Sequence, residues 1–230
     1  TLSLHDALPI LVTIFAGVGL SMLIAAPIGA AASQVGTLIM WATEQAPLVM
    51  GILVSVIVGV ALTLPISSAA ICAALGLTGL AGGAAVAGCC AQMVGFAVMS
   101  YKENGVGGLV SQGLGTSMLQ MGNIIKNPRI WIAPTLASAI TGPLATCLFH
   151  FEMNGAAVSS GMGTCGLVGQ IGVYTGWVSD IAAGTKAAIT PMDWAAMVLL
   201  CFVLPAVLSV VFCAVERKLG WIKEGDLKLN

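Results

Sequence analysis

Long uncharged stretches of the chain alternate with short segments that carry its charges. Residues 7–43 contain no Asp, Glu, Lys or Arg, and the same holds for 45–101. A helix needs about 20 apolar residues to cross a bilayer and rises about 1.5 Å per residue. The pattern therefore predicts an all-α polytopic membrane protein with about five transmembrane helices, near 10–40, 46–75, 79–100, 130–151 and 194–215.

Residues 153–179 are also uncharged, but their glycines interrupt every apolar stretch. Such a segment is typical of a re-entrant or broken element, which a membrane protein tolerates where protein surrounds it. Within it, SSGMGTCGLVGQI spells G-x-G-x-x-G at Gly161, Gly163 and Gly166. A dinucleotide-binding loop needs a preceding strand and an acidic residue about 20 positions later. No strand-like stretch precedes it, and Asp180 and Asp193 fall 14 and 27 positions after Gly166, so neither fits well. We interpret the three glycines as a re-entrant backbone hairpin.

Composition supports a membrane location and excludes several functions. Hydrophobic residues make up 58% of the 230 residues and charged residues 7%, with a mean hydropathy of +1.03. Soluble domains average about 25% charged residues, so the lipid bilayer must solvate most of this surface. The net charge of −1 argues against a nucleic-acid partner. No metal-ligand spacing or catalytic triad is present, so we expect no metal, no cofactor and no catalytic residue.

The basic residues predict the orientation, because cytoplasmic segments of membrane proteins are enriched in Lys and Arg. Four of the eight lie in the C-terminal tail, and three more flank the segment 102–129. Placing both inside leaves Lys186 alone outside. The sequence therefore predicts a cytoplasmic C-terminus, with these seven residues on the same side: Lys102, Lys126, Arg129, Arg217, Lys218, Lys223 and Lys228.

Pro65 interrupts the second predicted crossing, in the stretch TLPISSAA. Proline removes a helical hydrogen bond, and the freed carbonyls need other donors, such as Ser67 and Ser68. A simple kink would account for this stretch. A helix that breaks here and presents its backbone to a solute, as many transporters do, is the alternative.

The segment 103–126 has apolar residues at roughly helical spacing, which favours an interfacial amphipathic helix. After it, Asn127-Pro128 is a typical helix start, with Asn127 as the N-cap. The alternative is that Asn123 and Asn127 reach into a solute cavity.

Two further features also have a structural and a functional interpretation. Small residues at spacings of four in 76–95 let helices approach closely in lipid, although they could instead line a translocation path. His150 and Glu152 follow the fourth predicted crossing, where they form either a solvated pair or a proton-handling pair.

Three blocks of sequence resemble a known family. LVMGILVSVIVGVALTLPISSAAI, GNIIKNPRIWIAPTLASAITGPLAT and SSGMGTCGLVGQIG together resemble the membrane IIC component of phosphotransferase-system (PTS) sugar permeases, in the branch that includes the perfringolysin regulator-like proteins. The resemblance implies a homodimeric permease of the bacterial inner membrane. It also implies that a separate IIB component, supplied by IIA, phosphorylates the sugar, because this chain has no hydrophilic domain of that kind.

The chain is expected to have three parts. Residues 11–215 correspond to a partial IIC transmembrane domain that lacks N-terminal helices, and 216–230 form a cytoplasmic tail. Residues 1–10 are expected to be a non-native or truncated leader.

The leading hypothesis is a sugar permease whose binding cavity is built from the broken segments. Neutral amides and hydroxyls both donate and accept hydrogen bonds, as sugar hydroxyls require. Two alternatives remain open: a membrane sensor or regulator with a permease fold, and a transporter of a non-sugar solute. The residues predicted to bind substrate are Ser67, Ser68, Asn123, Asn127, Asn154, Thr164 and Gln170.

Overall fold

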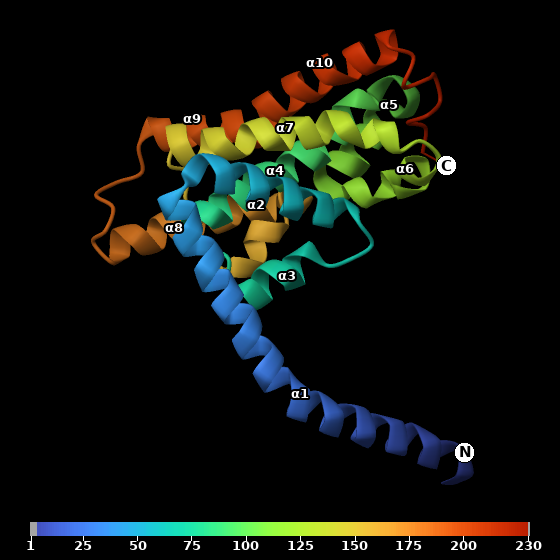
Figure 1. Cartoon of the computed structure of the whole chain (residues 1–230), viewed down its shortest axis with the longest axis vertical. Coiled ribbons are helices and arrows are strands. Elements are labelled where there is room, and N and C mark those ends of the chain that lie inside the picture. The colour runs from blue at the N-terminus through green and yellow to red at the C-terminus, as the bar shows by residue number, and fades with distance from the viewer. Residues whose placement is uncertain (1–3, 230) are drawn as a thin grey trace.

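The computed structural model describes residues 4–229, with side chains from 11–19 and 27–229, and this part of the chain is helical (Figure 1). Its only β-pairing is an isolated antiparallel bridge between Gly79 and Met153. The ten α-helices are α1 Leu4–Gln45, α2 Pro47–Thr63, α3 Ser68–Leu75, α4 Gly79–Met99, α5 Tyr101–Val110, α6 Met121–Lys126, α7 Ile132–Pro143, α8 Val168–Ala182, α9 Pro191–Val198 and α10 Leu204–Lys218.

Among the residues whose side chains the structure describes, three helical stretches are long and apolar enough to cross a membrane: Gly79–Met99, Pro128–Leu148 and Pro191–Lys218. They coincide with three of the five predicted crossings. The second stretch joins α7 to short 3₁₀ and π turns at its ends, and the third joins α9 to α10 through the π turn Leu199–Val203. The apolar helix α2 is shorter, with 17 residues.

The helix α1 covers the first predicted crossing and continues beyond it at both ends. Its 42 residues correspond to about 63 Å at 1.5 Å per residue. Figure 1 shows its N-terminal half extending away from the other helices. Its C-terminal part is anchored, because Gly36 abuts the backbone of Leu75 and the Thr78 hydroxyl donates to the Met40 sulfur at 3.5 Å.

The prediction of one continuous helix over 46–75 is wrong. The chain breaks at Pro65, so α2 ends at Thr63 and α3 begins at Ser68. Ser67 caps the new helix, because its hydroxyl accepts from the Ala70 N–H at 3.2 Å. Of the two interpretations of Pro65, the structure therefore supports the broken helix.

The break lets α2 and α4 run in the same direction. Gly59 of α2 abuts the Gly88 carbonyl of α4, and further along both helices Thr63 contacts Gln92 at 3.4 Å. A parallel pair requires a connection that returns along the helices, and residues 64–78, including α3, make that return. Two helices joined by a tight turn would instead have been antiparallel.

The segment 103–126 is interrupted and does not form one continuous amphipathic helix. It consists of α5, a π turn at Ser111–Gly115, a 3₁₀ turn at Ser117–Gln120, and α6. Gly105 lies inside α5 with φ of 60°, in the left-handed region that interrupts helical geometry.

The helix α4 lies at the centre of the fold, and 17 of its 21 residues are buried. It contributes residues to all three apolar clusters: Val86 to the first, Ala85 to the second and Phe96 to the third. Its glycines lie where neighbouring backbone comes closest, as at Gly83 beside the Phe151 carbonyl and at Gly88 beside the Ser55 carbonyl. Of the two interpretations of these small residues, the close approaches at Gly83 and Gly88 support tight packing.

Replacing Gly88 with Ala is expected to destabilise the protein. A methyl group there would overlap the carbonyl of Ser55, so the backbone of α2 would have to move. Overpacking of this kind costs about 1–3 kcal/mol, which thermal unfolding of the purified protein in detergent would detect. The matched control is Gly122→Ala in α6, where no atom lies within 4 Å of the added methyl. Equal melting temperatures for the two variants would contradict the packing role of Gly88.

Candidate functional site

The two irregular segments, 64–78 and 149–167, meet beside α4. Met153 and Gly79 exchange backbone hydrogen bonds of 3.0 Å in both directions. Further along, the Ser68 hydroxyl donates to the Gly161 carbonyl at 2.7 Å. The structure thus brings together two of the residues predicted from sequence, although they lie 93 positions apart.

The glycine segment folds back on itself as a hairpin. Gly163 has φ of +52°, and an added Cβ would lie 2.8 Å from the Cys89 backbone, so this position requires glycine. Gly166 also has φ of +52°. The chain then reverses into α8, with Gly169 donating to the Gly163 carbonyl at 3.0 Å, and Gly176 of α8 lies beside the backbone of Asn154. The hairpin therefore starts and ends at the same end of α4.

Thr164 and Gln170 lie at the inner end of this hairpin and are buried. The Thr164 hydroxyl donates to the Gly113 carbonyl at 2.5 Å. The Gln170 amide nitrogen lies 3.2 Å from the Cys90 sulfur, whereas its Oε1 has no hydrogen-bond partner among the described residues. A buried amide oxygen without a donor costs about 1–3 kcal/mol, so it is available to a donor from outside the protein.

A second polar group in the interior was not predicted from the sequence. Gln92, fully buried in α4, accepts from the Trp131 indole N–H at 3.0 Å and donates to the Thr135 hydroxyl at 3.2 Å. Thr63 connects the same amide to the Ser117 hydroxyl, at 3.4 and 2.8 Å. Gln92 is the only side-chain amide in the apolar run 79–100, and a lone amide within a predicted membrane span was the signal that could have identified it.

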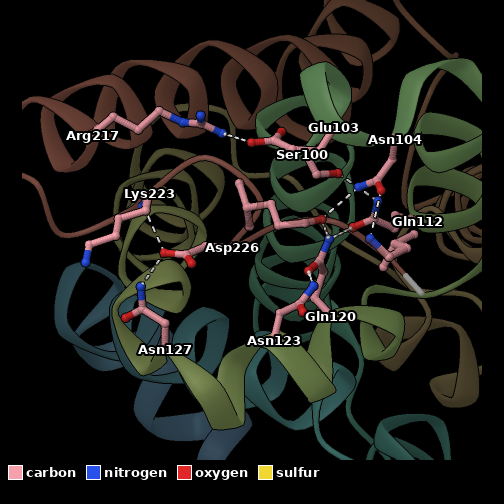
Figure 2. Close-up of polar contacts among 12 residues, drawn as sticks. Ser100, Glu103, Asn104, Gln112, Gln120, Asn123, Asn127, Arg217, Lys223 and Asp226 are labelled. Carbon is pink, nitrogen blue, oxygen red and sulfur yellow. Dashed lines mark hydrogen bonds and ion pairs between the residues drawn. The ribbon is translucent and has the colours of Figure 1, made fainter.

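Asn123 and Asn127 lie beside the returning C-terminal tail, and Figure 2 shows their polar contacts with it. Asn123 donates to the Lys228 carbonyl at 3.0 Å and to Gln120 Oε1 at 2.7 Å. Asn127 donates to the carboxylate of Asp226 at 2.9 Å, and its own Oδ1 accepts from the Arg129 N–H at 3.3 Å. The cap interpretation of Asn127 is thus confirmed, and both amides are occupied by contacts within the protein.

The tail is held by further contacts over α5 and α6. The amides of Asn104 and Gln120 both donate to the carbonyl of Leu227, at 2.8 and 3.0 Å. Gln120 also donates to the side-chain oxygen of Gln112 at 2.9 Å, which holds the Gln120 amide in place. The Leu227 side chain is fully buried in the apolar cluster that includes Phe96. The residues 219–229 therefore form a strap, which closes this end of the molecule.

Asn154 lies at the opposite end, in a polar cavity of about 460 Å³. Its side-chain nitrogen donates to Glu152 at 3.1 Å and to Asp180 at 2.9 Å. His150 also lines this cavity, so the pair His150 and Glu152 belongs to a shared polar chamber. The remaining predicted residue, Ser67, serves as the exposed cap of α3.

The predicted site residues thus occupy three places: the hairpin, the end closed by the strap, where Asn123 and Asn127 lie, and the polar cavity, where Asn154 lies. Ser68, Gly161, Gly163, Thr164 and Gln170 lie at the hairpin, with Ser67 and Gly166 at its margins. In the described part of the chain, no group of three or more His, Cys, Asp or Glu side chains could hold a metal ion.

Apolar helices of spanning length and irregular backbone packed in the interior define this chain as a multi-pass helical membrane protein. A family model described as "Phosphotransferase system, EIIC" matches residues 7–229. The chain belongs to this family, and membership implies PTS partner components. No curated protein and no solved structure matched the chain.

Replacing Leu227 with Ala is expected to loosen the strap over 219–229. The change removes a fully buried side chain, which typically costs about 2–5 kcal/mol, and part of that cost would appear as local opening of the tail. Limited proteolysis or hydrogen exchange of the tail would measure this opening. Leu219→Ala, at a position 57% exposed, is the control. Equal protection of the tail in both variants would contradict the anchoring role of Leu227.

Proposed function

We propose that this chain is a PTS sugar permease of the IIC type, which carries a sugar across the bacterial inner membrane while a separate IIB component phosphorylates it. The observation that carries the proposal is the junction of the two irregular segments beside α4. There the amide oxygen of Gln170 has no hydrogen-bond partner among the described residues. Family membership supports the same function.

Membrane physics explains why this junction suits a transport site. In lipid, irregular backbone is stable only where other groups satisfy it, so transporters confine broken helices to the surroundings of their substrate. Here Ser68 satisfies the carbonyl of Gly161, and Thr164 satisfies that of Gly113. A sugar hydroxyl could replace either hydroxyl donor and also donate to Gln170 Oε1, because hydroxyls donate and accept.

The distribution of basic residues supports an orientation for the proposed permease. Seven of the eight Lys and Arg residues belong to α5, α6, the end of α10 and the segments next to them, all at the C-terminal end in Figure 1. We place this end in the cytoplasm. In this topology the five proposed crossings are α1, α2, α4 and the stretches 128–148 and 191–218. Because α2 and α4 both run toward the cytoplasm, residues 64–78 return through the protein to the outer side between them. The segment 153–179 is re-entrant from the outside.

The partners follow from the same proposal. A IIB component supplied by IIA would approach the cytoplasmic end, where the segment 101–131 and the strap lie. We also propose a homodimer in the inner membrane, on the family resemblance. A regulator with a permease fold, as in the perfringolysin regulator-like branch, would bind a solute at the same junction without transporting it.

The test is uptake of radiolabelled sugars by cells that express the full-length protein, with and without IIB. We expect one sugar to accumulate as its phosphate only when IIB is present. Binding of a sugar without uptake would favour a membrane regulator. Uptake of a non-sugar solute without IIB would favour a transporter of non-sugar solutes. Absence of uptake and binding for every sugar would overturn the proposal.

Thr164→Ala and Gln170→Ala are each expected to lower kcat/KM for uptake about three- to tenfold. Each removes one hydrogen-bonding group, worth about 0.5–1.5 kcal/mol, from the proposed site. The controls are Thr37→Ala and Gln34→Ala, which make the same changes on the exposed surface of α1. Wild-type kinetics in both site variants, at equal expression, would mean that the hairpin serves packing alone.

A further inference from the structure

We propose that the polar cavity between the C-terminal end of α8 and the start of α9 is an outer binding site for a hydroxyl-rich solute that carries no negative charge. The inference rests on the proposed permease function and adds to it a second site and a charge selectivity. Figure 1 shows this end opposite the C-terminus, so in the proposed orientation it faces the outside.

The cavity is large enough for a small solute and is mostly polar. Its volume of about 460 Å³ lies within the range of about 300–1,000 Å³ that is typical of ligand sites. Four segments form it: the chain after α7, the C-terminal end of α8, the following loop and the start of α9. The polar and charged side chains in its wall are His150, Glu152, Asn154, Asp180, Thr185, Lys186 and Asp193.

Two carboxylates in this wall are held close together without a cation. The side-chain nitrogen of Asn154 lies 3.1 Å from Glu152 Oε2 and 2.9 Å from Asp180 Oδ2, so one amide group bridges both. Among the described residues neither carboxylate belongs to an ion pair. Because an ionised carboxylate can accept about four hydrogen bonds, most of the accepting capacity of this pair is unused by protein side chains.

Lys186 is the single lysine or arginine in the wall of the cavity, and it already belongs to an ion pair. Lys186 pairs with Asp193 at 2.8 Å, and its ammonium also lies 5.6 Å from the centre of the Trp177 ring. Trp177 in turn contacts Trp194 edge-on at a centroid distance of 5.6 Å. The wall therefore carries three carboxylates and one ammonium, which leave it with a net charge of −2 when His150 is neutral. The carboxylates are those of Glu152, Asp180 and Asp193.

These features select a class of solute. Hydroxyl and ammonium groups can donate to Glu152 and Asp180, whereas an anion would meet net negative charge with no free cation to pair with. A neutral sugar or an amino sugar fits this chemistry, and a sugar acid or a sugar phosphate does not. Exclusion of sugar phosphates also suits an outer site, because phosphorylation by the proposed IIB component occurs at the other end of the protein.

The experiment uses the full-length protein in nanodiscs and measures binding by calorimetry. The probes are glucose, galactose, mannose, xylose, mannitol and sorbitol, with glucosamine and glucuronate as cationic and anionic partners of glucose, together with any sugar found by uptake. We expect at least one neutral or amino sugar to bind and glucuronate not to bind. Glu152→Gln and Asp180→Asn should each raise Kd at least tenfold. Glu44→Gln, the same change at an exposed carboxylate near the C-terminal end of α1, should leave Kd unchanged.

A second readout covers the case in which these variants fold poorly. Thr185→Cys, in a Cys147→Ser background, places a thiol in the exposed part of the cavity wall. The sugar that binds should slow its labelling by a membrane-impermeant maleimide, and glucuronate should not.

The outcomes separate the two proposals. Tight binding of glucuronate, or a transported sugar whose Kd and protection are unaffected by Glu152→Gln and Asp180→Asn, would overturn the outer site and leave the permease function standing. If no probe binds and no sugar is transported by the wild-type protein, both proposals fail.

Discussion

Close approach of backbones to α4 is the constraint on which the rest of the structure depends. Lipid offers no hydrophobic drive between apolar helices, so their association relies on packing and on hydrogen bonds. Gly83 and Gly88 let the carbonyls of Phe151 and Ser55 lie against this helix. At the same close range Ser138 can donate to the Gly88 carbonyl at 3.2 Å, and the Ser55 hydroxyl to the Ser138 carbonyl at 2.9 Å. Larger residues in α4 would separate all these partners.

The same close packing makes irregular backbone possible in the interior. The segments 64–78 and 149–167 leave helical geometry near α4, where their carbonyls meet hydroxyl donors such as Ser68 and Ser160. In contact with lipid those carbonyls would have no partner. The arrangement concentrates polar groups along one helix, from Gln170 beside Cys90 to Gln92 and its partners.

The two ends of the molecule differ in chemistry and in closure. At the C-terminal end, amides of Asn104, Gln120 and Asn123 are satisfied by carbonyls of the returning strap, so this end is closed by the chain itself. At the opposite end, Glu152 and Asp180 surround an open polar cavity. This asymmetry agrees with the proposed function, in which a solute enters from one side and is passed to a partner on the other.

The pattern of charges and apolar runs in the sequence by itself determined the helical membrane class and the positions of α4 and of the stretches 128–148 and 191–218, because membrane thickness and hydration act on local composition. The tertiary structure alone decided that α2 runs parallel to α4, that Asn127 binds the strap, and that Asn154 belongs to a separate cavity. Pro65 and Asn127 were each compatible with two structures. The choice depended on partners such as Gly161 and Asp226, which lie about a hundred residues away and act only through packing in three dimensions.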